Sequence, residues 1–347
     1  MWRRSSCLSQ RRFIKMGKYD VKRAVIPCAG KGTRFLPVTK GTPKEMCPIV
    51  DKPTLDYIVD ECIDGGITNI LIILSEGKDD IRRYYHNDDD YEKELIEKGK
   101  TEFASIIHNV ANKANFYFTM QHELLGLGHA VLQAKEFIKN ENFIVCCGDD
   151  ICTYEGDAPS KQLIEAFKKT NGHTIVGGQK VKHEMISKYG CMDINREESA
   201  RLYSLKGIVE KPNIEEAPSD LASLGKWVFN SKIFDYIEKT PKGKGGEIQL
   251  TDAIALMIKD EPVYFYDFVG KRYDCGDKLG YLKAIVDVAL KRDDLKDSFK
   301  EFLKEKGLID EFGQVIDDEW CPLDRTTGAG KLHWRLLWWI QRIVWRN

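Results

Sequence analysis

Short apolar runs alternate with longer segments of helical period from Val21 onward, and no other feature of the sequence constrains the fold as much. The runs are KRAVIPCAG, NILIILSE, NFYFTMQ, NFIVCCGDD and HTIVGGQKV. Between them lie segments with helix signals, such as PTLDYIVDECIDGG, which a proline opens and two glycines close. Repeated strand, helix and strand units require right-handed crossovers and a sheet covered on both faces. The sequence therefore predicts an α/β fold with a mixed, mainly parallel sheet flanked by helices.

The pattern changes after about residue 182. Shorter β-like pieces follow, namely YGCMDI, RLYSLKGIVEKP and LGKWVFN, before helical segments return near 231–238, 247–259 and 279–291. We expect a first part at about 21–182 and a smaller β-containing lobe at about 183–275 that packs over the site. A last helical stretch, DLKDSFKEFLKEKGLI, ends the predicted domain near residue 305.

Charge, cysteine and histidine content exclude several classes of function. The 53 basic and 54 acidic residues leave a net charge of −1, so no global field favours nucleic acid. The ten cysteines are scattered without a C-x-x-C pair, which indicates reduced thiols in a cytoplasmic protein. The seven histidines lack paired metal-ligand spacing, and no apolar run approaches the roughly 20 residues of a membrane span. We expect a cytoplasmic protein without a transmembrane segment.

The two ends differ in composition from the rest of the chain. Residues 1–20 form a basic extension, disordered or not native, whose first 18 residues carry six Arg or Lys and no acid, as in a transit peptide. The simpler interpretation is that the chain proper starts at Met16. Residues 306–347 form a tail in which GAGKLHWRLLWWIQRIVWRN predicts a basic amphipathic helix. This helix would contact a membrane surface or a partner. The alternative is that the segment comes from a reading-frame error and is not native.

The loop AGKGTR follows the first predicted strand and contains two glycines. Glycine lets the backbone approach a ligand closely, and Arg34 and Lys44 add positive charge beside backbone amides. These features predict a phosphate cradle, although a tight turn explains the glycines as simply. The loop matches neither G-x-x-x-x-G-K-[ST] nor G-x-G-x-x-G. In an open parallel sheet, the loops that follow the first, third and fourth strands would meet at one ligand-binding crevice.

Six motifs occur in a fixed order: AGKGTRFLPVTKGTPKEMCPIVDKP at 29–53, then GLGHAV, GDD, VEKP, EIQLTDAI and YDCGDKLGYLKA. Together they resemble the motifs of sugar-nucleotide pyrophosphorylases, and in particular of bacterial-type UTP:glucose-1-phosphate uridylyltransferases. The resemblance covers about residues 21–305. It implies a Rossmann-like, GT-A-like nucleotidyltransferase domain that joins UTP and glucose 1-phosphate into UDP-glucose and releases pyrophosphate.

Such a reaction depends on cations and positioned amides, because its nucleophile needs no general base. The attacking oxygen belongs to a phosphate whose second pKa of about 6 leaves it ionised. The barrier comes from repulsion between two anions and from charge that builds on pyrophosphate. Mg²⁺ bridges phosphate oxygens and takes only one or two protein carboxylates. The resemblance implies Asp149 and Asp274 as these ligands, while the alternative is that Asp149 caps a turn after its strand.

The cations expected at the reacting phosphates come from three segments. Lys211 in VEKP would place its ammonium between the two phosphates, although most lysines lie on the surface. Loss of one preorganised donor of this kind raises a barrier by about 3 to 4 kcal/mol. The resemblance implies Lys211, Arg34 and Lys44 as the catalytic residues.

The resemblance also implies residues that bind the sugar and the base. Glu210 would accept hydrogen bonds from sugar hydroxyls, and Gly190 and Gly225 would bring backbone to the ring unless they are turn glycines. Gln121 carries a donor and an acceptor for the uracil edge. The nucleotide-binding set is Ala29, Gly30, Gly32, Gln121 and Gly126.

The chain departs from the family pattern at Cys47 and at Asp277, where the family more often has asparagine. An extra carboxylate near the metal would tighten its binding or raise a neighbouring pKa. A related enzyme that uses dTTP is an alternative, because one methyl group changes binding by only about 1 to 3 kcal/mol. A sugar-nucleotide-dependent glycosyltransferase and a membrane-associated nucleotide-binding regulator are further alternatives. The resemblance implies a homodimer or homotetramer.

Overall fold

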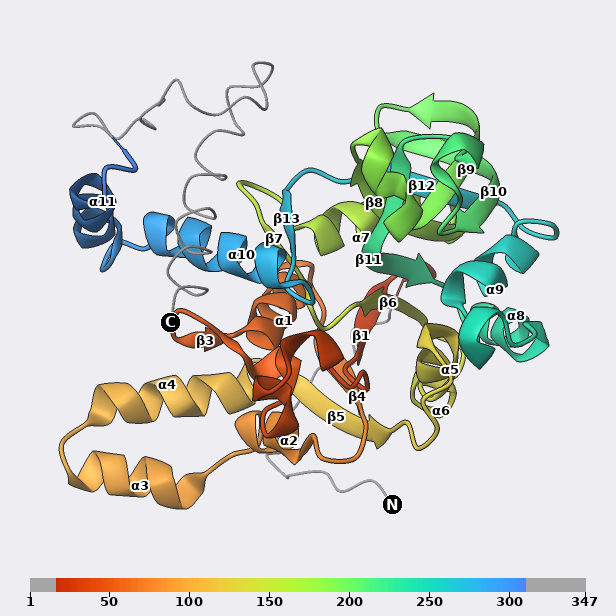
Figure 1. The fold of residues 1–347 in the computed structure, drawn as a ribbon. Coiled ribbons are helices and arrows are strands. Elements are labelled where there is room, and N and C mark those ends of the chain that lie inside the picture. Colours follow the sequence, from red (N-terminus) through yellow and green to blue (C-terminus); the bar gives the residue numbers. More distant parts are fainter. Residues whose placement is uncertain (1–16, 310–347) are drawn as a thin grey trace.

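Nine strands form one sheet in the computed structural model, which describes residues 17–309 (Figure 1). Their order across the sheet is β5, β4, β1, β6, β11, β8, β12, β10 and β9. The strands are β1 (Val21–Pro27), β4 (Asn69–Leu74), β5 (Asn115–Met120), β6 (Asn142–Cys146), β8 (Thr174–Lys180), β9 (Gly190–Ser199), β10 (Leu202–Glu210), β11 (Leu221–Phe229) and β12 (Val263–Asp267). The predicted α/β class with a mixed sheet is confirmed.

One half of the sheet is parallel and brings the ends of its strands to a common edge. Strand β1 pairs in parallel with β4 and β6, and β4 pairs in parallel with β5. Strand β11 then runs antiparallel to both β6 and β8, and β10 runs antiparallel to β12 and β9. The β-like pieces after residue 182 therefore extend the main sheet, with β12 parallel to β8.

Helices cover both faces of the sheet because its strands alternate their buried side chains. Along β1, Ala24 and Ile26 pack into the core under α1 and α7, whereas Val25 packs on the opposite face with α5, α8 and α9. The helices are α1 (Thr54–Asp64), α2 (Asp79–Tyr84), α3 (Asp89–Glu97), α4 (Thr101–Asn112), α5 (Leu127–Leu132), α6 (Lys135–Ile138), α7 (Pro159–Lys169), α8 (Ile233–Lys239), α9 (Leu250–Met257), α10 (Lys278–Lys291) and α11 (Lys296–Glu305).

Helix α1 shows how the sequence sets these elements. Its buried residues Leu55, Ile58, Val59 and Cys62 recur at the spacing of one helix face. The helix follows Pro53 and stops at two glycines, of which Gly66 adopts a left-handed φ of 85°. The start at the proline and the end at the glycines that the sequence predicted for this helix are thus confirmed.

Two short ladders lie outside the main sheet and position the site. Strands β7 (Asp150–Thr153) and β13 (Lys271–Asp274) pair antiparallel, with Asp150 opposite Asp274. Strands β2 (Pro48–Ile49) and β3 (Lys52–Pro53) form the second ladder. In Figure 1, β7 and β13 lie between α10 and the half of the sheet that contains β8 and β9.

The two predicted terminal segments fall largely outside the described residues. The basic extension up to residue 16 and the tail from residue 310 are not among them. Among residues 17–309, no helix has the length and apolar character needed to cross a membrane.

Candidate active site

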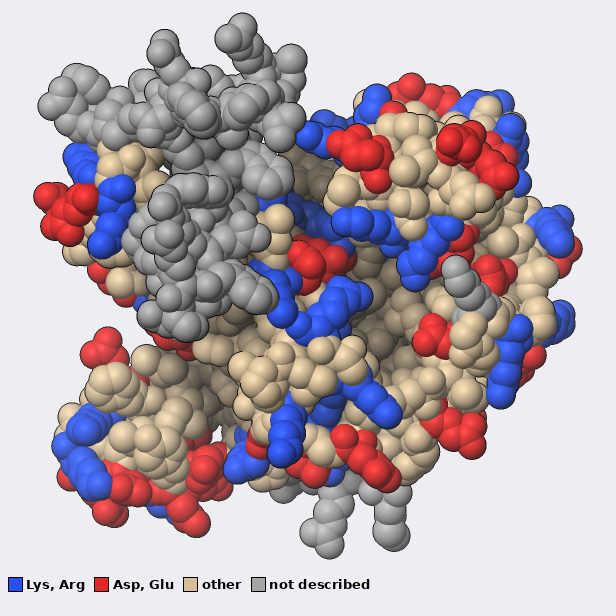
Figure 2. All heavy atoms as spheres, in the orientation of Figure 1, with Lys and Arg blue, Asp and Glu red and all other residues tan. Residues whose placement is uncertain are grey.

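A cavity of about 210 Å³ lies at the sheet edge where the parallel strands end. Figure 2 shows a hollow near the middle of one face of the molecule, with basic and acidic side chains around it. The cavity brings together seven of the predicted residues, namely Arg34, Asp149, Gly190, Glu210, Lys211, Gly225 and Asp274. These residues come from well-separated segments of the chain, so the fold gathers them as one site.

Asp149 lies just beyond β6 and pairs with a lysine from another segment. Its Oδ2 accepts a hydrogen bond from Nζ of Lys44, which lies in a short 3-10 turn (Lys44–Met46). Burial alone would raise the pKa of Asp149, but Lys44, Arg34 and Arg272 hold it below the ordinary value. Burial would lower the pKa of Lys44, but the Asp149 and Glu45 carboxylates raise it. Both groups are therefore charged at neutral pH.

Asp274 ends β13 and faces the same space as Asp149. A Cβ at Gly276 would lie 2.5 Å from Asp149 Oδ2 and 3.1 Å from Asp274 Oδ1, so both oxygens converge beside this glycine. Burial raises the pKa of Asp274, and the nearby Asp150 and Asp149 carboxylates act in the same direction against Arg272. A divalent cation between the oxygens would offset this repulsion.

The two convergent carboxylates fit the ligand set that Mg²⁺ takes from proteins. Residues 17–309 contain no group of three or more His, Cys, Asp or Glu side chains placed to hold a metal. A cation at Asp149 and Asp274 would therefore complete its shell with water and substrate phosphate, as Mg²⁺ commonly does.

Asp277, where the chain departs from the family pattern, binds the backbone at the start of α10. Its Oδ1 accepts hydrogen bonds from the backbone N–H groups of Leu279 (3.0 Å) and Gly280 (3.2 Å). It is thus the N-cap of α10. An asparagine at position 277 would make the same cap, so the contact explains a capping residue at this position and not the choice of aspartate.

The opposite wall of the cavity is formed by β9, β10 and β11. Gly190 opens β9 and pairs with Glu210 at the end of β10, and Lys211 follows directly. A Cβ at Gly190 would lie 3.3 Å from Glu210 Oε2, so the bare glycine leaves room beside this carboxylate. Lys211 Nζ lies 3.2 Å from Glu210 Oε1, and the side chain of Lys211 remains 59% exposed. Gly225 on β11 adopts a left-handed φ of 61°.

The predicted nucleotide-binding residues lie along the sheet edge, and none of them lines this cavity within the part of the chain that the structure describes. Gln121 follows β5, is 4% exposed, and donates from Nε2 to the Gly126 carbonyl at 3.2 Å. A Cβ at Gly30 would lie 4.0 Å from Lys44 Nζ, and one at Gly32 would lie 3.3 Å from Lys44 Cβ. Lys44 therefore connects the loop of Ala29, Gly30 and Gly32 to Asp149.

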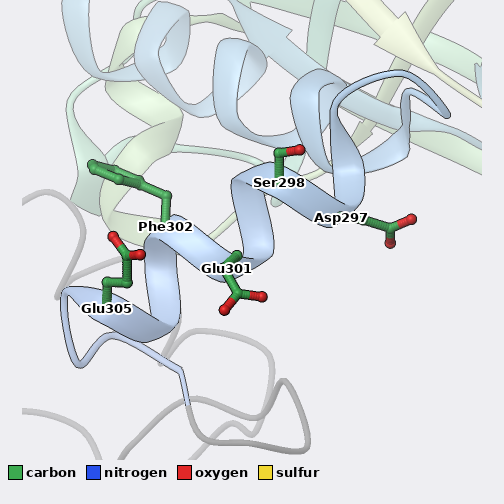
Figure 3. Close-up of a pocket in the computed structure, with 5 residues that line it drawn as sticks. All are labelled: Asp297, Ser298, Glu301, Phe302 and Glu305. Atoms are coloured by element: carbon green, nitrogen blue, oxygen red, sulfur yellow. The ribbon is translucent and has the colours of Figure 1, made fainter.

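A second, larger hollow of about 480 Å³ runs along α11 (Figure 3). Within residues 17–309, its lining comes from one helix and consists of Asp297, Ser298, Glu301, Phe302 and Glu305. These described lining residues include three carboxylates and no basic side chain, which makes them unsuited to phosphate. The cavity at the sheet edge is therefore the candidate active site.

Comparison with known proteins identifies the family of the chain. The sequence family described as "Nucleotidyl transferase" matches residues 23–291, which is well over half of the chain. The chain belongs to the nucleotidyl transferase family. The resemblance that the ordered motifs predicted is thereby confirmed, and with it the classification of the chain as an enzyme.

Individual nucleotidyl transferases show how far the similarity extends. A relative from Staphylococcus haemolyticus named UTP–glucose-1-phosphate uridylyltransferase is 45% identical over 289 residues, which are 83% of this chain and 99% of the relative. A solved structure described as UTP-bound UGPase from Acinetobacter baumannii has a TM-score of 0.77 at 34% identity, and covers 82% of this chain and 99% of its own. A UDP-glucose pyrophosphorylase complexed with UDP-glucose has a TM-score of 0.72 at 37% identity, over 79% and 100%.

Sequence reasoning missed two basic residues that line the cavity of this nucleotidyl transferase, Lys188 and Arg272. Arg272 on β13 lines the cavity, and its Nε and Nη2 donate to the two oxygens of Asp150 at 2.5 and 2.8 Å. No motif contained it, because it precedes YDCGD and only the pairing of β13 with β7 places it opposite Cys152 and near Asp150. Since Arg272 binds both of its oxygens, Asp150 is not available as a ligand in the way that Asp149 is.

Proposed function

We propose that this chain transfers the uridylyl group of UTP to glucose 1-phosphate, giving UDP-glucose and pyrophosphate. The observation that carries the proposal is the lining of the 210 Å³ cavity, where two convergent carboxylates, Asp149 and Asp274, lie together with Arg34 and Lys211. Anion-binding side chains and an acidic pair in one small cavity suit a reaction between two phosphates. The names of the staphylococcal relatives at about 45% identity support the choice of substrates.

The reaction is an in-line displacement without a covalent enzyme intermediate. A phosphate oxygen of glucose 1-phosphate attacks the α-phosphorus of UTP, a new P–O–P bond forms, and the bond between the α-phosphorus and the bridging oxygen to the β-phosphate breaks. Pyrophosphate leaves with the electron pair of that bond. Since the nucleophile is already ionised, the protein needs to orient two anions and stabilise developing charge.

Three basic residues supply that stabilisation in our proposal. Lys211 contacts the sugar phosphate and the α-phosphate of UTP from the β10 side. Arg34 donates from Nη1 to the Gly276 carbonyl at 2.9 Å, which places its guanidinium beside the segment that holds Asp274. Lys44, paired with Asp149, faces the glycine loop that would hold the triphosphate. Charged donors fixed before reaction cost no reorganisation at the transition state.

The metal in this proposal is Mg²⁺, held by Asp149 and Asp274. When bound, it supplies positive charge to phosphate oxygens and so lowers the repulsion between the substrates. The chain itself orients the two carboxylates: the Asp149 carbonyl accepts a hydrogen bond from the Cys275 N–H at 2.8 Å, and the Gly276 N–H donates to Asp274 Oδ1 at 3.0 Å.

The remaining residues divide between base and sugar. Gln121 and the backbone of Ala29, Gly30, Gly32 and Gly126 would hold the nucleotide in the part at about 21–182. Glu210, with backbone at Gly190 and Gly225, would accept the hydroxyls of glucose in the part at about 183–275. We place the enzyme in the cytoplasm as a homodimer or homotetramer.

A matrix of nucleotides against sugar 1-phosphates, read as pyrophosphate release, tests the proposal. We expect the highest kcat/KM for UTP with glucose 1-phosphate and none without a divalent cation. Asp149→Asn and Lys211→Ala should lower steady-state turnover by about 10²- to 10³-fold, which removes nearly all activity in a simple assay, with the fold intact, as circular dichroism would show. A higher kcat/KM for dTTP, or substantial turnover by either variant, would contradict the assignment.

A further inference from the structure

Lys211 has a backbone conformation that a lysine does not adopt unaided. Its φ is 46°, in the left-handed region that favours glycine. Residues held in this way persist only where their surroundings compensate, and they concentrate at functional sites. The contacts of Lys211 must therefore compensate for the strain of its left-handed conformation.

One hydrogen bond restrains the backbone of Lys211 directly. The Lys211 N–H donates to the Tyr189 carbonyl at 3.0 Å, one step beyond the last β9 and β10 pair, Gly190 with Glu210. Tyr189 lies just before β9, outside the regular ladder. The position of Tyr189 therefore sets the position of Lys211.

Arg272 holds the side chain of Tyr189 from across the cavity. Its Nη1 donates to the Tyr189 hydroxyl at 3.1 Å, and its guanidinium lies 5.1 Å from the centre of the Tyr189 ring. The other side-chain nitrogens of Arg272 bind Asp150, and its side chain is only 14% exposed. Three of its five N–H groups are bound to these two partners, and its Nη2 also lies 3.8 Å from Asp274 Oδ2, so Arg272 acts as a brace between the two sides of the site.

We propose that Arg272 and Tyr189 are positioning residues that hold Lys211 in its left-handed conformation at the cavity. The contacts run from Asp150, beside the metal ligand Asp149, through Arg272 and Tyr189 to the backbone of Lys211. They join the β7 and β13 ladder to the β9 and β10 wall, two pairs of strands that lie apart in Figure 1. This inference rests on the proposed function, in which Lys211 contacts the reacting phosphates.

The variant Tyr189→Phe tests the proposal with the least disturbance. It removes the hydroxyl that binds Arg272 and keeps both the ring and the carbonyl that binds Lys211. Because hydrogen bonds to charged groups are the stronger ones, we expect kcat for UDP-glucose formation to fall roughly ten-fold, with KM for UTP unchanged. Arg272→Lys, which keeps the charge and loses the bidentate geometry, should lower kcat at least as much.

A double-mutant cycle separates positioning of Lys211 from a general structural defect. In single-turnover measurements on the Lys211→Ala background, Tyr189→Phe should have no further effect, because the side chain that it positions is gone. A general defect would lower the rate by the same factor in both backgrounds, and that result would overturn the proposal. So would an unchanged kcat in both Tyr189→Phe and Arg272→Lys.

Tyr203→Phe is the matched control, because it removes a hydroxyl from the distal end of β10, where the Tyr203 ring packs near Phe265. It should leave kcat unchanged, and thermal unfolding should show that all variants are folded. If the wild-type chain forms no UDP-glucose, the proposed function fails before the cycle begins. If it does and the cycle shows no coupling, only the role of Arg272 and Tyr189 fails.

Discussion

Gly225 lines the cavity at a position where no side chain fits. Its φ of 61° disfavours any L side chain, and a Cβ there would lie 2.5 Å from Asp150 Oδ2 and 3.0 Å from Asp150 Cβ. Asp150 cannot move aside freely, because Arg272 binds both of its oxygens. The glycine therefore lets β11 approach the segment that carries Asp149.

Gly225→Ala should consequently lower both stability and activity. We expect the free energy of unfolding to fall by about 3 kcal/mol, from backbone strain of about 1 kcal/mol and a further overpacking cost. Urea unfolding measures the first effect and pyrophosphate release the second.

Gly156→Ala is the control for the backbone contribution. Gly156 has a φ of 90°, and a Cβ there would meet no atom within 4 Å. It should lose only about 1 kcal/mol and keep full activity. Equal losses for the two variants would show that the close approach to Asp150 does not matter.

At the scale of elements, a buried ion pair joins α1 to β11 beneath the site. The side chain of Lys226 is fully buried, and its Nζ lies 3.2 Å from Glu61 Oε2 and 3.1 Å from the Asp150 carbonyl. Glu61 Oε1 in turn accepts from the N–H of Ser160 in the first turn of α7 at 3.1 Å. Two helices and two strands thus share one charged centre.

Lys226→Met should lower the free energy of unfolding by about 3 to 5 kcal/mol, because it leaves the Glu61 carboxylate buried without its countercharge. Adding Glu61→Gln should restore much of this loss, since a neutral amide costs less to bury. Urea unfolding of the single and double variants measures both effects. Lys98→Met, which removes an exposed ion pair with Glu94, should cause no measurable change. A loss for Lys226→Met no larger than for Lys98→Met would contradict this account.

Periodicity predicted the elements whose signals are local. The pattern around residues 54–64 gave α1 with its end at the glycines, and the apolar runs gave β1, β4, β5, β6 and β8. Helix α4 was not predicted, although Phe103, Ile106, Ile107 and Val110 recur at the spacing of one helix face. In the structure, Phe103 and Ile106 on this face are 57% and 55% exposed.

Site residues that come shortly after a strand in the sequence could be predicted. Residues that reach the site only because two distant strands pair could not. Asp149 and Gln121 come directly after β6 and β5, so the topology of a parallel sheet indicated their edge. Arg272 acquires its partners only when β13 pairs with β7 and Tyr189 comes within reach. Such contacts join positions more than 80 residues apart, which no local pattern encodes.

At the scale of the whole molecule, residues 17–309 contain two hydrophobic cores and the cavity lining described above. One core lies under α1 and α7 and the other under α5, α8 and α9, with the sheet between them. The lining of the cavity runs from Arg34 to Asp274, well inside residues 17–309. The match of 289 residues to 99% of the Staphylococcus haemolyticus relative points to the same extent.

Residues 17–309 alone should therefore fold and retain the activity of the full chain. Terminal segments outside a folded unit are commonly removed at little cost, so we expect kcat/KM within a factor of about two of the full-length value. Pyrophosphate release and thermal unfolding of both proteins measure this. A shortened chain that folds but turns over far more slowly would mean that residues outside 17–309 act on the site. A chain that does not fold would mean that the two cores need a further covering element, and either result would contradict the placement of the whole catalytic unit within these residues.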